Sequence, residues 1–376
     1  MHINPFILTP YLSKDLFCDR EEETEKLIAY LESGRNITLI SPRRLGKTGL
    51  IYRVFDEIAI RNIGYDTLYV DISATSSIDG FIKALSEAVA CNLKNKNRVS
   101  SFIKTLGGIR PLISYDAMTG QPELSFTYRT DSEKQTTLKS ILSYLESRGN
   151  TVVVAIDEFQ QIREYEGVNM EAVLRTHIQN LHNVRFIFCG SKQHIMFDMF
   201  SNAKRPFYES TVTVPLHKLD VDKYAEFISR LFLKNGKTID DETTRFIIKW
   251  TKDHTFYTQS LCNEAFMISR KTVTMEDVFT ASRNLLMAGR EYYLEIQRLI
   301  SAHQWNLLKA IAKEEYVRQP TSSFFIRKHG LTSGASVLKS LNALVEKELV
   351  LITNTTDGPV YSVYNVFLSR YLEILQ

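Results

Sequence analysis

The sequence has few cysteines and no long apolar run. Its four cysteines are far apart and include no C-x-x-C pair, so we expect neither a zinc site nor a disulfide framework. This favours a reducing compartment, and we expect a cytoplasmic protein. No segment approaches the ~18–20 apolar residues of a membrane helix, and the first 15 residues lack the basic and apolar regions of a signal peptide. We therefore expect no membrane partner.

The sequence also lacks a strong charge of one sign. It has 46 Lys and Arg against 43 Asp and Glu, a net charge of +3, which is too small to indicate a nucleic-acid partner by itself. Hydrophobic residues make up 44% and charged residues 24% of the chain, as in ordinary globular proteins with a buried core. The 376 residues suffice for two or three domains of ~100–200 residues.

One motif lacks its first glycine. The stretch ITLISPRRLGKTGLIYRVF (37–55) ends its loop in the G-K-T of a phosphate-binding loop, G-x-x-x-x-G-K-[ST], but Ser41 replaces the first glycine. That glycine only helps the chain leave the strand, and Ser41 followed by Pro42 can make the same turn because proline fixes φ. An apolar strand precedes the loop and a helical apolar pattern follows it, which is the context the motif requires.

The loop predicts a magnesium nucleotide site. Backbone N–H groups at the helix N-terminus would converge on phosphates, Lys47 would bind the β- and γ-phosphates, and the Thr48 hydroxyl would bind Mg²⁺. We expect ATP or ADP as the ligand. The expected binding residues of the loop are Pro42, Arg43, Arg44, Leu45, Gly46, Lys47, Thr48 and Gly49.

A second acidic motif, TVVVAIDEF (151–159), supplies the carboxylates that such a site needs. Carboxylates that end a buried strand are costly unless they serve a cation or water. We expect Asp157 to hold Mg²⁺ through water and Glu158 to act as the general base for the attacking water. The simpler interpretation is a strand exit with two solvated acids.

Strands alternate with helices up to about residue 216. The runs 36–41, 67–73, 151–159, 184–191 and 211–216 read as strands, and this alternation predicts a parallel sheet covered on both faces, an α/β fold. We therefore assign residues 1–216 to a P-loop domain with an insertion at about 92–130. In the insertion, a basic run (92–110) reads as a solvated loop or a partner-binding surface, and residues 111–128 read as a hairpin around 118–122.

The remainder of the chain reads differently. Four helical patterns predict an all-α domain at 217–298, with Asp240 and Thr274 as N-caps. Residues 299–376 read as three helices and a hairpin with Asp357 and Gly358 near its turn, a winged helix-turn-helix. Its presumed recognition helix is weakly basic, and we expect Leu338, Leu341, Leu344 and Val345 on its apolar face. Protein docking is therefore favoured over DNA, which stays an alternative partner.

Several motifs together resemble one family. FCDREEE (17–23), SPRRLGKTGLI (41–51), VVVAIDEFQQI (152–162) and FIFCGSKQHIM (186–196) are similar to archaeal-type P-loop ATPases of the STAND class, which are related to AAA+ proteins and to archaeal origin-recognition initiators. The resemblance covers residues 1–290, and a C-terminal winged helix is usual in the family. It implies a three-layer AAA+-like sheet with the 184–191 strand between the loop strand and the 151–159 strand.

The resemblance also implies residue roles. Ser191 would lie beside the γ-phosphate as sensor-1, Arg205 would be the arginine near that phosphate with Arg43 and Arg44 as rivals, and Arg20 would line the adenine pocket. Arg205 can also be read as a surface residue before a proline. The segment 253–261 lacks the glycine and proline of the family's lid.

These patterns predict a Mg²⁺-dependent ATPase that acts as a nucleotide-dependent switch. The alternatives are a module that binds nucleotide without turnover and a DNA-binding regulator. A protein partner or self-association is expected.

Overall fold

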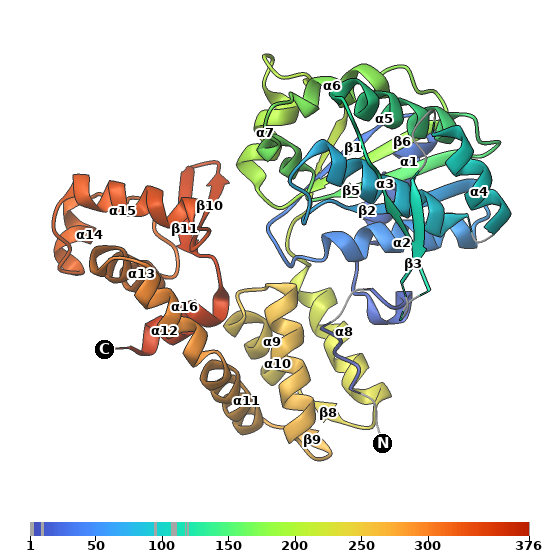
Figure 1. The fold of residues 1–376 in the computed structure, drawn as a ribbon. Coiled ribbons are helices and arrows are strands. Elements are labelled where there is room, and N and C mark those ends of the chain that lie inside the picture. The colour runs from blue at the N-terminus through green and yellow to red at the C-terminus, as the bar shows by residue number, and fades with distance from the viewer. Residues whose placement is uncertain are drawn as a thin grey trace. The chain divides into compact units, whose positions relative to one another are not determined.

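The computed structural model describes residues 4–8, 11–93, 96–106, 111–116, 118 and 120–375, with only the backbone for residues 96 and 97. The chain forms two compact units (Figure 1). Pro10–Lys218 is the sheet unit, and Leu219–Gln376 together with Met1–Thr9 is the helical unit. Among the described residues, no helix is both long and apolar enough to cross a membrane.

A five-stranded parallel sheet in the order β2-β5-β6-β1-β7 organises the sheet unit. β6 lies between β5 and β1, so the predicted strand order and the α/β P-loop fold are confirmed. The parallel register places Asp71 of β2 opposite Asp157 of β5. The strands are β1 (Ile37–Ile40), β2 (Tyr65–Asp71), β5 (Thr151–Asp157), β6 (Val184–Gly190) and β7 (Val212–Pro215).

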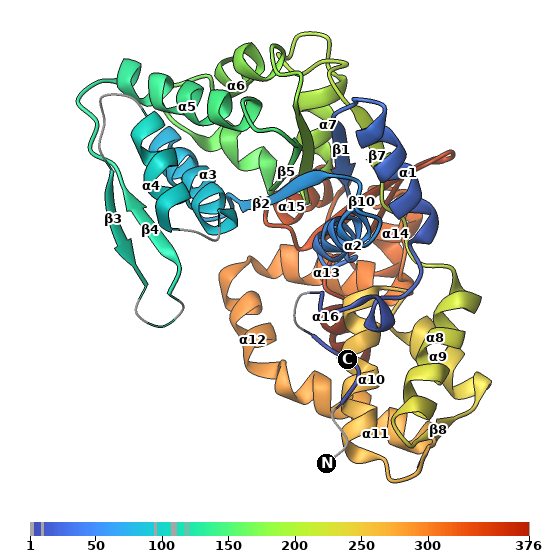
Figure 2. The same cartoon turned by 90° about the vertical axis from the view of Figure 1, so that its right-hand side faces the viewer.

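Helices cover both faces of this sheet, giving three layers (Figure 2). Alternate residues of β5 point to opposite faces: Val153 and Ala155 pack with α1 and α2, whereas Val152 and Val154 pack with α3, α5, α6 and α7. These helices are α1 (Glu21–Glu32), α2 (Lys47–Ile60), α3 (Ile78–Asn92), α5 (Asp131–Glu146), α6 (Met170–Ile178) and α7 (Gln193–Ser201), with short 3-10 helices η1 (Lys14–Leu16) and η2 (Phe159–Glu164).

The insertion between β2 and β5 contains a helix where one interpretation expected a solvated loop. α4 (Lys96–Thr105) buries Val99 and Phe102 in the core, because apolar residues three to four positions apart share a helix face. The expected hairpin is confirmed as β3 (Leu112–Tyr115) paired with β4 (Pro122–Ser125). Residues 94, 95 and 107–110 of the basic run, and 117 and 119 near the turn, lie outside the described residues.

The helical unit begins with the four expected helices, α8 (Val221–Lys234), α9 (Asp241–Trp250), α10 (Thr255–Ile268) and α11 (Met275–Ala288), followed by α12 (Arg290–Leu299). Asp240 caps α9, and Thr274 forms a capping box with Asp277, as predicted. Two strands of two residues each, β8 (Thr238–Ile239) and β9 (Thr272–Val273), also pair. The all-α expectation missed them because two residues carry no periodicity. Phe6 of the N-terminal segment packs on Phe232 at a ring-centroid distance of 4.6 Å.

The winged helix follows as α13 (Ala302–Glu314), α14 (Ser323–Lys328), α15 (Gly334–Glu346), β10 (Val350–Thr355), β11 (Gly358–Val363) and an additional helix, α16 (Val366–Ile374). In α15, Leu341 and Leu344 are buried and Val345 is half-buried, as expected. The expectation for Leu338 is wrong: it is 51% exposed, and Val337 is buried instead. Val337 lies four and seven positions before Leu341 and Leu344, which sets the buried stripe.

Helix α16 joins the winged helix to the first part of the helical unit. The Phe367 ring lies 4.8 Å from the Tyr257 ring and 6.0 Å from the Trp250 ring. Lys252 Nζ donates to Ser369 Oγ at 2.9 Å, and Arg370 Nε donates to the Trp250 carbonyl at 2.9 Å. These contacts explain why residues 219–376 form one compact unit.

Candidate nucleotide site

The loop between β1 and α2 has the backbone shape of a phosphate cradle. Gly46, the N-cap of α2, has φ +90°, and Arg44 has φ +65°. Lys47 is the first residue of α2, so the free N–H groups of the helix N-terminus lie at the loop. Ser41 is fully buried at the strand exit in place of the missing glycine.

Side chains around the loop fix it in different ways. Leu45 is buried and anchors the loop in the core, whereas Arg43 and Arg44 are exposed and Pro42 is half-buried. A Cβ on Gly49 would lie 2.7 Å from the Phe17 ring. A larger residue at position 49 would therefore require the Phe17 ring to shift, because this ring lies against the start of α2.

The buried ammonium group of Lys47 lies between two carboxylates. Its Nζ is 3.5 Å from Asp157 Oδ1 and 3.5 Å from Glu158 Oε1. Both distances are long for charge-assisted hydrogen bonds, which are usually ~2.7–2.9 Å. The ammonium group is therefore held near the acids without a tight ion pair.

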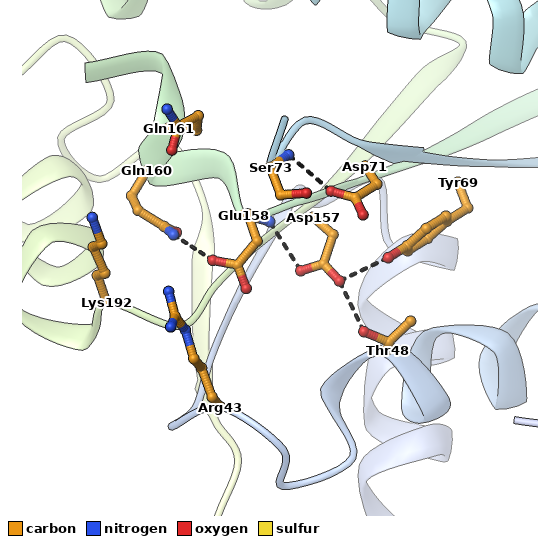
Figure 3. A pocket seen from close by; sticks show the side chains of 10 residues that line it. All are labelled: Arg43, Thr48, Tyr69, Asp71, Ser73, Asp157, Glu158, Gln160, Gln161 and Lys192. Atoms are coloured by element: carbon orange, nitrogen blue, oxygen red, sulfur yellow. Dashed lines mark hydrogen bonds between the residues drawn. The ribbon is translucent and has the colours of Figure 1, made fainter. Parts of the chain in front are cut away.

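Asp157 is the most enclosed acid of the site. Its Oδ2 accepts hydrogen bonds from Thr48 Oγ1 and from the Tyr69 hydroxyl, both at 2.8 Å, and its Oδ1 accepts from the Glu158 N–H at 2.9 Å (Figure 3). Burial first, and then the Asp157 charge, raise the pKa of Tyr69. Tyr69 therefore stays protonated and remains a hydrogen-bond donor to Asp157.

Glu158 sits in the left-handed backbone region at φ +55°, a conformation that costs energy for a residue with a side chain and is common at functional sites. Its Oε2 accepts from Ser191 Oγ at 2.7 Å and from the amide of Gln160. Arg43 Nε in turn donates to Ser191 Oγ at 3.4 Å. These contacts bring together residues from β5, the end of β6 and the phosphate loop.

A pocket of about 390 Å³ opens at this end of the sheet (Figure 3). Its polar lining comes from the loop, from the ends of β2 and β5, and from the segments that follow β5 and β6. The lining residues are Arg43, Thr48, Tyr69, Asp71, Ser73, Asp157, Glu158, Gln160, Gln161 and Lys192.

The donor atoms of this pocket fit Mg²⁺. The Thr48 hydroxyl and an Asp157 carboxylate oxygen lie 2.8 Å apart, and both are hard oxygen ligands of the kind that Mg²⁺ binds together with substrate phosphates. No group of three or more His, Cys, Asp or Glu side chains able to hold a metal ion occurs in the described part of the chain. A magnesium ion here would therefore depend on Thr48, Asp157 and the phosphates.

Arg43 lines this pocket, whereas Ser191, Arg44, Arg205 and Arg20, also implied by the resemblance, are not among its lining residues. Arg205 donates to Asp198 Oδ2 at 2.7 and 2.9 Å and to Glu171 Oε1 at 3.4 Å. Burial raises the pKa of Glu171, while Arg205 acts in the opposite direction. The buried Arg20 guanidinium donates to Glu23 at 2.6 Å and to the His217 carbonyl.

Sequence reasoning missed Tyr69 and Gln160. Tyr69 is two residues before the end of β2 and opposite Ala155, so its contact with Asp157 depends on the parallel register. Gln160 follows the acids directly, and the signal that could have revealed it is the polar pair Gln160-Gln161 after the apolar Phe159.

Comparison with solved structures shows the fold. The Walker-type ATPase of Pyrococcus abyssi is similar with a TM-score of 0.68 and 17% identity, over 98% of this chain and 100% of the other. The ORC2 protein of Aeropyrum pernix, in ADPNP–ADP complexes, has a TM-score of 0.60 and 13% identity, over 98% and 95%. ORC1 of the same organism, in complex with DNA, has a TM-score of 0.54 and 13% identity, over 98% and 96%.

Comparison with protein families identifies both parts of the chain, whereas a comparison with curated proteins finds no match. Residues 291–374 match a probable winged helix domain. Residues 17–252, more than half of the chain, match an ATPase domain predominantly from Archaea. The chain therefore belongs to this family of archaeal-type ATPases and carries a C-terminal winged helix domain.

Proposed function

We propose that the protein binds ATP with Mg²⁺, hydrolyses it to ADP and phosphate, and acts as a nucleotide-dependent switch of the STAND type. One observation carries the proposal: Glu158, which lines the polar pocket, contacts Lys47 at the N-terminus of α2 and Ser191 after β6, residues from segments far apart in sequence. The family membership of residues 17–252 supports the same conclusion.

Nucleotide binding would use the loop from Pro42 to Gly49. Its backbone N–H groups would contact the phosphates, and Lys47 would move from the two acids to the β- and γ-phosphates. The similar ORC2 protein was solved with ADPNP and ADP, which supports an adenine nucleotide. Arg20 is proposed to border the adenine; its present contacts, to Glu23 and the His217 carbonyl, hold it at the start of α1.

In the proposed reaction, the oxygen of a water attacks the γ-phosphorus and Glu158 accepts the proton of that water. The bond between the γ-phosphorus and the bridging oxygen breaks, and its electron pair leaves with ADP. Mg²⁺, held by Thr48 and through water by Asp157, would neutralise phosphate charge. Ser191 would orient the γ-phosphate, and Arg205, Arg43 or Arg44 would stabilise its charge. Positioning and charge stabilisation dominate catalysis of this type.

The contacts of the Glu158 carboxylate favour a second function, which is nucleotide binding without turnover. The Glu158 carboxylate is already engaged by Ser191, Gln160 and Lys47. If these contacts persist with ATP bound, Glu158 cannot accept a proton from water and the protein would remain a nucleotide-bound scaffold.

The variant Glu158→Gln distinguishes the two functions. It keeps the shape of the side chain and removes the base, so ATP affinity should persist while kcat falls by roughly 10²–10⁴-fold. Glu164→Gln is the matched control, because Glu164 is a carboxylate of the same segment that contacts Lys192 at 3.0 Å. If the wild type with Mg²⁺ releases no phosphate, hydrolysis is wrong and the scaffold function takes its place.

We also propose partners for the winged helix. A protein partner or self-association through the winged helix is favoured over DNA because the exposed face of α15 carries one basic residue, Lys339, and one acid, Glu346. The DNA complex of the similar ORC1 protein keeps DNA as the alternative partner. The four cysteines, all within the described residues, form no disulfide, and three of them are buried; a reducing, cytoplasmic location is part of the proposal.

A further inference from the structure

Two glutamines follow the acidic pair and differ in their surroundings. Gln160 is 3% exposed, and its amide donates to Glu158 Oε2. Gln161 is half-buried, and its amide donates to Glu164 Oε2 at 3.3 Å. In Figure 3 the Gln160 amide points to Glu158, whereas Gln161 points away from the acids. Of these two adjacent glutamines, Gln160 is the one that donates a hydrogen bond to the proposed base, Glu158.

The segment that carries Gln160 is fixed by aromatic packing. The preceding residue, Phe159, is fully buried, and its ring lies 4.4 Å from the Phe188 ring and 5.5 Å from the Phe207 ring. This anchor holds η2 against the core, so the Gln160 amide is presented to Glu158 from a rigid base.

The end of β6 leaves space for this amide. A Cβ on Gly190 would lie 2.4 Å from Gln160 Oε1 and 2.5 Å from Met196. Gln160 Oε1 is buried and has no hydrogen-bond partner among the described residues. A buried acceptor without a partner has lost its hydrogen bonds to water with no replacement, so glutamine is unfavourable at this position if the side chain only fills space.

The two oxygens of Glu158 have different partners. Oε2 accepts from Gln160 and from Ser191 Oγ, whereas Oε1 faces only the Lys47 ammonium at 3.5 Å among the contacts of the described residues. When Lys47 turns to phosphates, Oε1 loses its partner while Oε2 stays held. Oε1 is then the oxygen available to a water.

We propose that Gln160 is a positioning residue that holds Glu158 Oε2 so that Oε1 accepts the proton of the attacking water. This inference rests on the proposed ATP hydrolysis. Gln160 touches neither water nor phosphate in the proposed step; it acts through the orientation of the Glu158 carboxylate.

Gln160→Met in the full-length chain tests the proposal, since methionine preserves length and burial and removes the donor. We expect kcat to fall by about 10- to 100-fold, the scale of one hydrogen bond to a charged group, with the Kd for ATP changed less than about two-fold. Gln161→Met removes the same amide one position along, from a side chain that lines the pocket and bonds to Glu164 instead of Glu158, and its loss of kcat should be smaller than that of Gln160→Met. Gln160→Leu, a second apolar side chain without the donor, should lose kcat like Gln160→Met and guards against a folding defect in one variant.

A double-mutant cycle separates positioning from a structural role. In the Glu158→Gln background, Gln160→Met should cause no further loss of kcat, because Gln160 acts only through the Glu158 carboxylate. An equal loss in both backgrounds would overturn the proposal, as would Gln160→Met turning over like the wild type; in both cases ATP hydrolysis itself would stand. Absence of phosphate release by the wild type would instead refute the proposed function, and the inference with it.

Discussion

Charged side chains are arranged differently at the pocket of the sheet unit and in the winged helix. At the pocket, Lys47 lies 3.5 Å from each of two carboxylates. In the winged helix three basic groups form closer pairs: Lys328 lies 2.6 Å from Glu314, Arg370 lies 2.7 Å from Glu373, and Arg318 lies 2.9 Å from Asp357.

This difference indicates which charges are available to a ligand. A phosphate can replace long contacts to Lys47 at low cost, because little hydrogen-bond energy is lost when the ammonium turns away. Lys328, Arg370 and Arg318 of the winged helix already have close acidic partners, so their binding to a polyanion would first require breaking those pairs. Net charge alone does not reveal this, since both regions contain acids and bases in similar numbers.

The largest effect is expected from Lys47→Ala. A charge-assisted hydrogen bond contributes ~1.5–3 kcal/mol, so ATP affinity should fall by about 10- to 100-fold. Folding should persist, because Asp157 keeps its donors Thr48 and Tyr69. Isothermal titration calorimetry with Mg²⁺ and ATP measures the effect.

Lys328→Ala is the matched control for Lys47→Ala. It removes a lysine that is already closely paired with Glu314 and should leave ATP affinity unchanged. Equal losses of ATP affinity in the two variants, or no loss in Lys47→Ala, would contradict the comparison. The distance from a lysine to its acidic partners would then not indicate whether that lysine binds a ligand.

A smaller effect is expected where the winged helix packs within its own unit. Phe367→Ala removes a half-buried ring that contacts Tyr257 and Trp250 and should lower the free energy of unfolding of the helical unit by about 1–2 kcal/mol. Both tryptophans, Trp250 and Trp305, lie in this unit. Tryptophan fluorescence during urea unfolding therefore reports on the helical unit.

Phe324→Ala provides the comparison. Phe324 is 72% exposed, and its truncation should change the midpoint of that transition little. If both phenylalanine variants unfold at the wild-type urea concentration, α16 does not stabilise the helical unit through Phe367.

The features that could be predicted from the sequence are those that depend on residues close together in the chain. The P-loop sits between a strand and a helix in consecutive residues, and the acids end a strand, so the fold could be predicted from these residues. The strand order was implied by the resemblance to a known family, and both are confirmed. The functional roles of Lys47, Thr48, Asp157 and Glu158 stay predictions. Helix α4 was read as a loop in one interpretation because its many polar and basic residues concealed the apolar spacing of Val99 and Phe102.

Other features depend on contacts that sequence order does not contain. Tyr69 reaches Asp157 only because β2 and β5 pair in one parallel register. Gln160 reaches Glu158 only because Gly190 of β6 leaves space beside it. Phe367 is more than 100 residues from its ring partners Trp250 and Tyr257. Such contacts need the packed structure.

Tyr69→Phe tests whether the acid at the pocket is oriented for magnesium. It removes one hydrogen bond to Asp157. The Mg²⁺ concentration that half-saturates ATP binding should therefore rise by about five-fold, equivalent to ~1 kcal/mol. Tyr52→Phe is the control, because the Tyr52 ring lies 5.1 Å from the Tyr69 ring. Among the described residues, the hydroxyl that this variant loses does not donate to Asp157. The half-saturating Mg²⁺ concentration measures the effect, and equal shifts in both variants would contradict a specific role for the Tyr69 hydroxyl.

The smallest effect is expected for DNA. If the close ion pairs of Lys328, Arg318 and Arg370 neutralise the winged helix, the full-length chain should bind random duplex DNA weakly. A plot of the logarithm of the binding constant against the logarithm of the salt concentration should then have a negative slope of about 2 or less in magnitude. Each phosphate contact contributes ~0.9 to this slope. Lys339→Ala, on the exposed face of α15, should change binding by less than about two-fold, as measured by fluorescence anisotropy. Tight binding at physiological salt with a slope near 6 would show that the paired charges of the winged helix open for DNA, and a reduced slope in Lys339→Ala would place α15 at the interface. Both results together would make DNA regulation the leading function.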